Sequence, residues 1–244
     1  MARIKIKIAY KGTNYNGWQI QPNGMTVQEE IQNALKKITK ENIVIHGSGR
    51  TDSGVHAHGQ IAHFDTQSTI PPKRFYKALN SHLPMDIRVV DSELVEADFH
   101  SRFSAIGKYY RYGIYLGEVS DPFLDSYYWH IDYPINLEKM EEALPYFVGT
   151  KDFRGFMASG SMVQDTTRTI NKIQMTQQEN RIHLDFWGNG FLYNMVRIIT
   201  GTLIEVGRGS LTPEAIEPLI QSKERSKAGK TAPARGLFLE EVFY

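Results

Sequence analysis

The order of strand-like and helix-like hydrophobic patterns along the chain constrains its fold more than any other feature of the sequence. Residues 3–10 carry apolar side chains at every second position, which is typical of a half-buried strand, and residues 26–38 carry them at helical spacing. Thr26 followed by Glu29 is the capping-box pattern of a helix N-terminus. The other elements expected before residue 104 are strands at 43–45, 60–65 and 87–90 and a helix at 71–82. This part of the chain therefore predicts the order β-α-β-β-α-β.

The remainder of the chain repeats this order. A strand is expected at 109–116, a helix at 137–147 and a long apolar helix at 191–206. The other expected elements are strands at 169–176, 181–187 and 237–243 and an added helix at 213–220. Because this is the split βαβ order of ferredoxin-like folds, we expect an α+β protein of two such halves, residues 1–104 and 105–244. Two mostly antiparallel sheets of this kind could leave a broad cleft between them, which suits a macromolecular substrate.

The composition argues against several classes of protein. The chain is 41% hydrophobic and 23% charged, as ordinary globular proteins are, and no apolar run approaches the roughly 18 residues that a membrane span needs. It has no cysteine, which excludes disulfides and thiolate metal sites. The first ten residues carry charge throughout, unlike a signal peptide. We therefore expect a soluble, cytoplasmic protein with no membrane partner.

The net charge of +1 indicates no particular partner, but the charge is unevenly distributed. Residues 223–235 (KERSKAGKTAPAR) hold five basic residues and one acidic residue among small side chains. This composition predicts a mobile surface loop. Whether such a loop is only solvated or contacts RNA stays open.

The segment GSGRTDSGVHAHGQ at residues 47–60 is the densest candidate for a site. Its glycines allow backbone angles that other residues avoid, and Arg50 and Asp52 lie two positions apart within it. An arginine keeps its charge when desolvated, so Arg50 could hold Asp52 ionised in a dry pocket, as a nucleophile or a base. The same pattern also fits a surface turn with an incidental ion pair.

Histidines follow this loop closely. His56 and His58 would share one face of a strand, and with Asp52 they could form the metal site of a hydrolase. No second carboxylate cluster completes such a set. Ordinary surface or core histidines, His63 among them, are the competing interpretation.

Two later segments mix cations with apolar residues. In KYYRYGIY (108–115), Tyr110 and Tyr112 share one face, and rings beside cations are what unstacked bases and phosphates bind. A half-buried strand with amphipathic tyrosines would look the same. Arg197 lies inside the apolar stretch FLYNMVRIITGTLI, where burial without a partner is costly. Asp52 is a candidate partner for Arg197, unless this arginine lies on an exposed stripe of the helix.

Seven segments, taken in order, resemble the TruA family of tRNA pseudouridine synthases. They are YKGTNYNGWQIQ (10–21), GSGRTDSGVHAHGQ (47–60), FHSRFSA (99–105), KYYRYGIY (108–115), GTKDFRGF (149–156), FLYNMVRIITGTLIEVG (191–207) and GLFLEEV (236–242). The resemblance spans essentially the whole chain, and the string GxGRTDxGVHA is highly specific. Ser48, Ser53 and Ser101 stand where alanine is common in the family, and these departures do not touch the chemistry.

The resemblance implies a set of site residues. The family's catalytic aspartate falls on Asp52 and its active-site arginine on Arg50. The active-site tyrosine falls on Tyr110, and the helix arginine that pairs with the aspartate falls on Arg197. The apolar residue that lines the base pocket falls on Leu237.

The resemblance also implies an isomerase that breaks the C1′–N1 bond of uridine, rotates the uracil and rejoins it through C5, with no cofactor. Members are homodimers whose clefts accept tRNA, and their targets lie in the anticodon stem-loop, at positions 38 to 40 in tRNA numbering. Whether Asp52 attacks the nucleotide or takes the C2′ proton stays open. Three other functions also stay open: an RNA-binding module without catalysis, a metal-dependent hydrolase, and the same chemistry on a different RNA.

Overall fold

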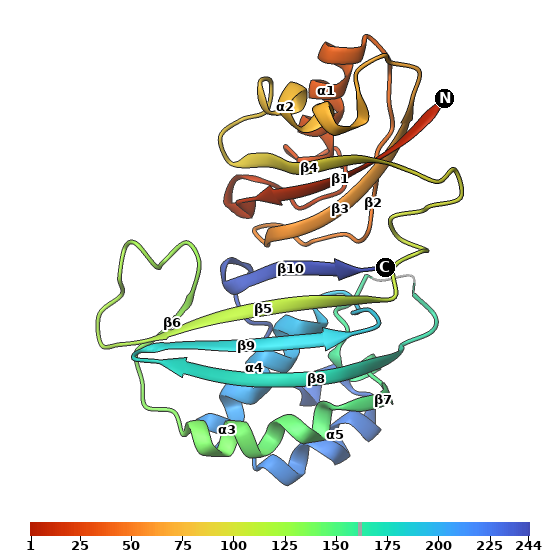
Figure 1. Ribbon diagram of the computed structural model, residues 1–244. Coiled ribbons are helices and arrows are strands. Elements are labelled where there is room, and N and C mark those ends of the chain that lie inside the picture. The colour runs from red at the N-terminus through yellow and green to blue at the C-terminus, as the bar shows by residue number, and fades with distance from the viewer. Residues whose placement is uncertain (161–162) are drawn as a thin grey trace. The chain divides into compact units, whose positions relative to one another are not determined.

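The computed structural model describes residues 1–160 and 163–244, and the chain packs as two compact units (Figure 1). Unit 1 comprises Met1–Ile106 together with Phe238–Tyr244, and unit 2 comprises Gly107–Leu237. These bounds differ from the expected halves in two respects: the boundary lies after residue 106 rather than 104, and the last strand of the chain belongs with the first unit.

Unit 1 is built on an antiparallel sheet. Strand β1 (Ala2–Tyr10) lies between β4 (Ile87–Val95) and β3 (His56–Thr66), and the short strand β2 (His46–Gly47) pairs with β3 on its other side. The strand order β4-β1-β3-β2 is the split βαβ arrangement. The alternation that predicted β1 is real, because its isoleucines at every second position are fully buried.

Two helices cover one face of this sheet (Figure 1). Helix α1 (Val27–Thr39) begins after Thr26, whose Oγ1 accepts a hydrogen bond from the Glu29 N–H at 3.4 Å, as the capping pattern predicted. Helix α2 (Phe75–Asn80) follows a 3₁₀ turn that opens at Pro72. Both bury apolar side chains against the strands.

Residues 43–45 do not form the expected strand, so this prediction was wrong. Ile43 and Ile45 are buried, but the ladder pairing with β3 begins at His46. The alternation therefore reflects packing of side chains rather than backbone pairing. A strand needs a partner in register, and only the tertiary fold provides one.

The strands of unit 2 pair mostly antiparallel. Strand β9 (Arg181–Gly188) lies between β5 (Gly107–Leu116) and β8 (Thr167–Gln178), and β7 (Gly149–Asp152) pairs with β8. The short strand β6 (Trp129–Ile131) adds to β5 in parallel. With this pairing, the expected α+β class with mostly antiparallel strands is confirmed.

Three helices gather on one face of the unit 2 sheet (Figure 1): α3 (Leu137–Ala143), α4 (Met195–Gly207) and α5 (Ile216–Ser222). The helix expected at 137–147 is α-helical only to Ala143 and continues as a 3₁₀ turn, because Pro145 has no N–H for the α-helical ladder. The long apolar helix begins at Met195 rather than at 191, after Asn194 in the left-handed conformation.

The closing strand β10 (Leu237–Phe243) runs parallel to β3, with Phe238 opposite His56 and Leu239 opposite Ala57. The hydroxyl of Tyr244 then donates to the carbonyl of Ser101 at 2.6 Å. These contacts are why the end of the chain belongs to unit 1, although the residues before it belong to unit 2.

The basic stretch 223–235 is packed on α4, and the expectation of a mobile loop was wrong. The Gly229 N–H donates to Thr202 Oγ1 at 2.9 Å, and the Ala232 N–H donates to the Arg197 carbonyl at 3.1 Å. Ala232 is fully buried. The small residues of this stretch let its backbone pack closely against the helix, rather than making the stretch flexible.

Within residues 1–160 and 163–244, every helix is too short or too polar to cross a membrane.

The contact between α4 and this stretch predicts a severe effect of Gly201→Ala. A Cβ at Gly201 would lie 1.7 Å from the Lys230 carbonyl oxygen, so the helix and the stretch would have to separate. We expect the free energy of unfolding to fall by about 1–3 kcal/mol, as overpacking of a core does. Urea unfolding followed by circular dichroism measures it.

Gly190→Ala is the matched control, because the nearest atoms to its Cβ lie 3.8 Å away. Equal stability of the two variants would contradict the packing described here.

Candidate active site

The loop that joins β2 to β3, residues 48–55, carries Arg50 and Asp52. The Ser48 N–H donates to the Ile61 carbonyl at 2.7 Å, and the Val55 N–H donates to the Asp52 carbonyl at 3.1 Å, which closes a turn. Asp52 is half-buried and Arg50 is exposed. The two residues therefore share one short loop, as the sequence predicted.

A buried polar network lies directly beneath this loop. Ser48 Oγ donates to Gln60 Oε1 at 2.6 Å, and Gln60 Nε2 donates to the Gly49 carbonyl at 2.9 Å. The hydroxyls of Tyr10 and Thr51 lie 2.7 Å apart. Since Gln60 is 0% exposed, its amide has no access to water and must bond to the loop. The network thus fixes the backbone on both sides of Arg50 and up to Asp52.

Tyr10 stays protonated in this network. Burial raises the pKa of its phenol far above the ordinary value, hydrogen bonds from Thr51 and Gln60 lower it, and the charge of Asp52 raises it further. A neutral Tyr10 keeps a hydroxyl proton to share with Thr51. Its role is to hold the loop, since its own side chain is buried.

A second loop, residues 11–18, packs on the first. The Trp18 N–H donates to the Thr51 carbonyl at 3.1 Å, and the Gly54 N–H donates to the Tyr15 carbonyl at 3.3 Å. Gly17 has a φ of +85°, and a Cβ there would lie 2.5 Å from the Thr51 carbonyl oxygen, so only glycine fits.

Sequence reasoning missed these supporting residues. Tyr10 in β1 and Gln60 in β3 are polar side chains that face the interior. A polar side chain on a buried face was the available signal, because such a group needs a partner. The partner itself was not predictable from local pattern.

Unit 2 holds the other three residues that the sequence predicted. Tyr110, in β5, is 8% exposed and meets the ring of Phe191 edge-on, with centroids 5.2 Å apart. Tyr112 shares its buried face, as predicted, and donates its hydroxyl to the Pro233 carbonyl at 2.7 Å. On the opposite face, Arg111 pairs with Asp185 at 2.7 Å.

Arg197 lies in the first turn of α4 and is half-buried rather than on an exposed stripe. Its Nε donates to the Ala232 carbonyl at 2.7 Å, and its Nη1 donates to Asn194 Oδ1 at 2.7 Å. The guanidinium is therefore held in a fixed direction by the stretch 223–235 and by the residue before the helix. Leu237, where β10 begins, is 5% exposed. Each of these residues is placed within unit 2, and the pairing of Arg197 with Asp52 stays a prediction.

The histidines after the loop have structural contacts. His56 Nδ1 accepts the Gly12 N–H at 3.0 Å, while His58 pairs with Glu240 at 2.9 Å. Both rings stack on Phe238, so the two share a face as predicted. Across residues 1–160 and 163–244, no group of three or more His, Asp or Glu side chains is arranged to hold a metal ion. The metal-dependent alternative therefore gains no support.

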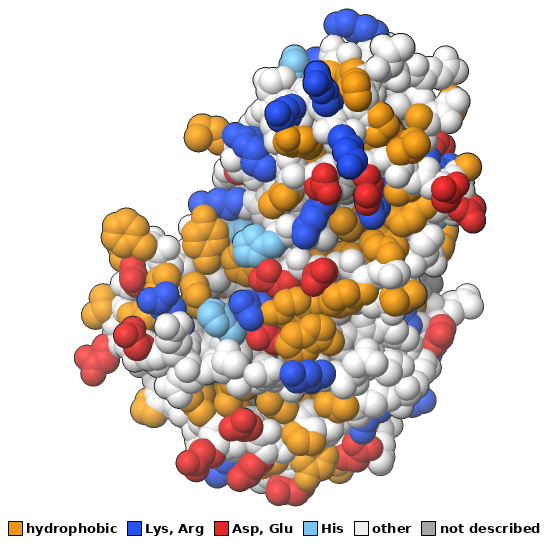
Figure 2. Space-filling model, viewed as in Figure 1, with side chains coloured by type: hydrophobic (Ala, Val, Ile, Leu, Met, Phe, Trp, Pro, Cys, Tyr) orange, Lys and Arg blue, Asp and Glu red, His pale blue; other side chains and the backbone are white. Residues whose placement is uncertain are grey.

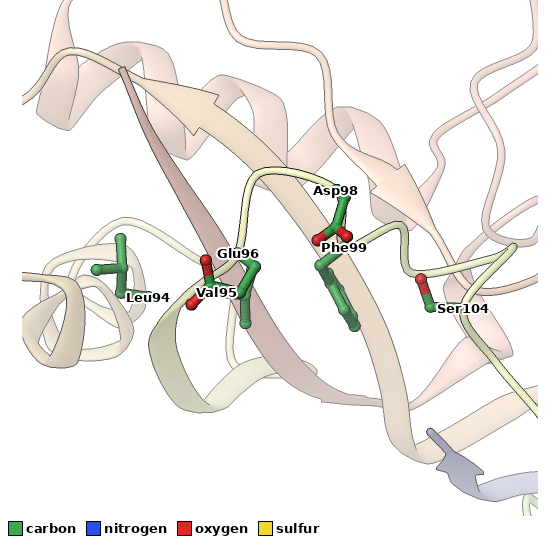
Figure 3. Close-up of a pocket in the computed structure, with 6 residues that line it drawn as sticks. All are labelled: Leu94, Val95, Glu96, Asp98, Phe99 and Ser104. Carbon is green, nitrogen blue, oxygen red and sulfur yellow. The ribbon is translucent and has the colours of Figure 1, made fainter.

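An open pocket of about 450 Å³ lies elsewhere on unit 1, between the end of β4 and Ser104 (Figure 3). It is lined by Leu94, Val95, Glu96, Asp98, Phe99 and Ser104. None of the residues predicted for the site belongs to it. Its two carboxylates make it unsuitable for a phosphate or another anion.

The family model described as tRNA pseudouridine synthase matches residues 6–104 and 143–244 of this chain. A relative from Acetivibrio thermocellus, named tRNA pseudouridine synthase A, is 46% identical over 244 residues and covers 100% of both chains. One from Clostridium perfringens, named tRNA pseudouridine synthase A 2, is 48% identical over 245 residues, again covering 100% of both. One from Bacillus velezensis is 46% identical over 99% of each chain.

Two solved structures that match most of this chain have low similarity to it. A structure described as a Cbf5-Nop10-Gar1 complex matches 83% of this chain and 54% of that chain, with 14% identity and a TM-score of 0.39. Because this TM-score is low, the fold is argued only from the strand pairing of this chain.

The buried network predicts that Gln60→Met loosens the loop. Methionine fills a similar volume but offers no hydrogen bond to Ser48 or to the Gly49 carbonyl, which leaves buried polar atoms unsatisfied. We expect a loss of about 1–3 kcal/mol of stability and faster hydrogen exchange of the amides of residues 48–55. Gln174→Met, at an exposed position of β8, is the control. Unchanged exchange in the loop would count against the network.

His63 predicts a pH dependence of stability. Burial, followed by the charges of His100 and His46, lowers its pKa from the ordinary 6.5 to about 4. Between these pH values the unfolded chain binds the proton more readily, so stability falls as the pH falls from 6.5 towards 4. In His63→Gln this fall should be smaller, measured by urea unfolding at several pH values. His82→Gln, at an exposed site, should keep the dependence of the original protein.

Proposed function

This chain belongs to the tRNA pseudouridine synthase family, and we propose that it isomerises uridine to pseudouridine in tRNA with Asp52 as the catalytic carboxylate. The observation that carries the proposal is the loop 48–55, because buried hydrogen bonds to Gln60 and Tyr10 hold its backbone while Asp52 stays only partly covered. A catalytic group must be held in one geometry and still reach its substrate.

The chemistry is an isomerisation that needs no co-reactant. The C1′–N1 bond breaks, a C1′–C5 bond forms, C5 loses its proton and N1 gains one, so the atoms and electrons of the nucleotide balance. Asp52 acts in one of two ways: it attacks the nucleotide and is later displaced, or it takes the C2′ proton and later returns it. Neither route calls for a cofactor or a metal ion.

Arginines are proposed to serve this carboxylate. Arg50 lies two positions away in the same loop, and its exposed guanidinium is available to enter the space that the flipped base leaves. Arg197 has its guanidinium oriented by Ala232 and Asn194, which prepares it to pair with Asp52 and keep it ionised. A permanent charge is needed here, since a desolvated aspartate would otherwise take up a proton.

Tyr110 and Leu237 are proposed to receive the uracil. Both are largely buried, and the ring of Tyr110 is held edge-on by Phe191. A fixed aromatic face can stack on a flipped base, and the phenol could assist proton transfer at C5. Leu237 would supply an apolar wall.

The substrate and assembly are finer proposals. We propose that the target uridines lie in the anticodon stem-loop, at positions 38 to 40, and that two copies of the chain act as a homodimer in the cytoplasm. The full-length match to relatives named tRNA pseudouridine synthase A supports tRNA as the substrate. The exact uridines rest on the family resemblance alone.

Tritium release from tRNA labelled at uracil C5 tests the reaction, because the label leaves only when C5 becomes the glycosidic carbon. We expect release by the original protein and none above background by Asp52→Asn, a loss of roughly 10⁴-fold or more, as when nucleophiles are removed from other enzymes. Asp125→Asn, at an exposed position of unit 2, should keep full activity.

The other outcomes separate the alternatives. No release by the original protein from any tRNA, with tRNA still bound, would favour an RNA-binding module without catalysis. Equal release by the original protein and by Asp52→Asn would keep the isomerase and remove Asp52 from its centre.

A further inference from the structure

A cluster of aromatic rings lies on the surface of unit 1, formed by His46, His63, His100 and Phe103. The His46 ring stacks on His63 with centroids 5.1 Å apart, and His100 meets His63 at 4.7 Å. Phe103 meets His100 at 4.3 Å with the ring planes tilted by 34°. The cluster thus runs from a buried ring, His63, to an exposed one, Phe103. None of these residues is used by the proposed reaction.

Phe103 is 76% exposed although it is a large apolar side chain. The turn that carries it is closed by hydrogen bonds between His100 and Ser104: the Ser104 N–H donates to the His100 carbonyl at 2.9 Å, and the His100 N–H donates to Ser104 Oγ at 3.0 Å. The ring is therefore held outward by a closed turn. A ring that the fold already holds in place loses little conformational freedom when a partner binds to it.

Two histidines of the cluster, His63 and His100, present neutral rings. His100 Nδ1 accepts hydrogen bonds from the N–H groups of Arg102 and Phe103, at 3.1 and 3.3 Å, so that nitrogen carries no proton. Burial lowers the pKa of both His100 and His63. At neutral pH these rings offer flat aromatic faces rather than cations, and flat faces stack on nucleobases.

Cations lie beside this aromatic surface. The Arg102 guanidinium lies 5.7 Å from the centre of the Phe103 ring, and Arg3 and Lys5 lie on the neighbouring strand β1. The carboxylates Asp65 and Glu93 pair with Arg3 and Lys5, at 2.7 and 2.5 Å. On the face drawn in Figure 2, Lys, Arg, Asp and Glu side chains are interspersed with hydrophobic side chains.

The adjoining pocket has the opposite character. Glu96 and Asp98 line it, and Figure 3 shows Asp98 beside Phe99 at its rim. An anionic ligand is repelled there, while an exposed ring with Arg102 over it attracts a flat group that carries negative charge nearby. A nucleotide has this combination: a flat base and a phosphate.

We propose that His46, His100 and Phe103 form a stacking site for an unpaired nucleobase of the RNA substrate, with Arg102 at the adjacent phosphate. The proposal rests on tRNA being the substrate and adds a second contact to it. Base stacking on aromatic side chains tolerates any base, so the site would add affinity without reading sequence.

This site is separate from the one that would hold the target uridine. His46 pairs with His63 near the far end of β3, whereas the loop 48–55 enters β3 at His56. The Val55 N–H donates to the Asp52 carbonyl at 3.1 Å, which ties Asp52 to the His56 end of β3. His56 and His63 are seven residues apart, about 23 Å along the strand at about 3.3 Å per residue. The stacked base is therefore a different nucleotide from the one that is isomerised.

The test measures the Kd of fluorescently labelled tRNA by anisotropy at fixed salt, for the full chain and its variants. Phe103→Ala should raise the Kd on the order of tenfold, the loss of one stacked base. Phe103→Trp should restore binding, and Phe103→Leu, which is apolar but not aromatic, should not. Because the side chain is exposed, thermal unfolding of all variants should match the original protein.

Phe123→Ala is the matched control. Phe123 is 86% exposed, but it lies near the acidic residues Asp121 and Asp125 in unit 2, which disfavour RNA. It should leave the Kd unchanged. Photo-cross-linking of tRNA that carries 4-thiouridine, followed by mass spectrometry, should join the segment 99–105 to the RNA, and the cross-link should be lost in Phe103→Ala.

Other outcomes overturn the proposal. An unchanged Kd for Phe103→Ala, with tritium release and tRNA binding intact in the original protein, would overturn the stacking site and leave the proposed function standing. A dimer that dissociates in Phe103→Ala, seen by sedimentation, with the same Kd per subunit, would assign the surface to a second copy of the chain. Absence of both tRNA binding and tritium release in the original protein would overturn the proposed function together with this site.

Discussion

The side-chain amide of Gln60 is the contact on which the candidate site most depends. It is fully buried on β3, and it bonds to Ser48 and to the Gly49 carbonyl, while Tyr10 on the adjacent strand holds Thr51. A loop rich in glycine would otherwise sample many conformations, at an entropic cost whenever one is required. Buried hydrogen bonds meet that cost during folding, so the backbone of the loop that carries Asp52 is held in one conformation.

In unit 2, close packing of two backbone segments, rather than a buried side-chain amide, holds a candidate site residue in place. The stretch 223–235 lies against α4 because glycine at 201 and at 229 lets two backbones approach, and this packing places the Ala232 carbonyl where it orients Arg197. Gly229 and Ala232 of this basic segment are thus buried against the helix, while most of its charged residues are exposed. Its composition alone resembles that of a mobile loop, since the same residues favour both flexibility and close packing.

Two consecutive segments of unit 1 form surface regions of contrasting chemistry. Residues 94–98 contribute carboxylates to an open pocket, and residues 99–103 contribute neutral rings and a cation to an aromatic cluster. The segment FHSRFSA stood out in the sequence only by resemblance. The ring contacts explain its pattern: His100 bonds to the turn that holds Phe103 outward, and Ser104 closes that turn.

The sequence by itself determined the class of fold, the strands and helices with clear periodicity, the cap at Thr26, and the shared loop of Arg50 and Asp52, because these depend on neighbours along the chain. The tertiary structure decided what depends on partners far away. Ile43 and Ile45 alternate but have no ladder, Pro145 ends a helix that the pattern would continue, and the last strand joins the first unit by pairing with β3. It also decided that Tyr10 and Gln60 hold the loop, since a buried polar side chain reveals its partner only when the chain has folded.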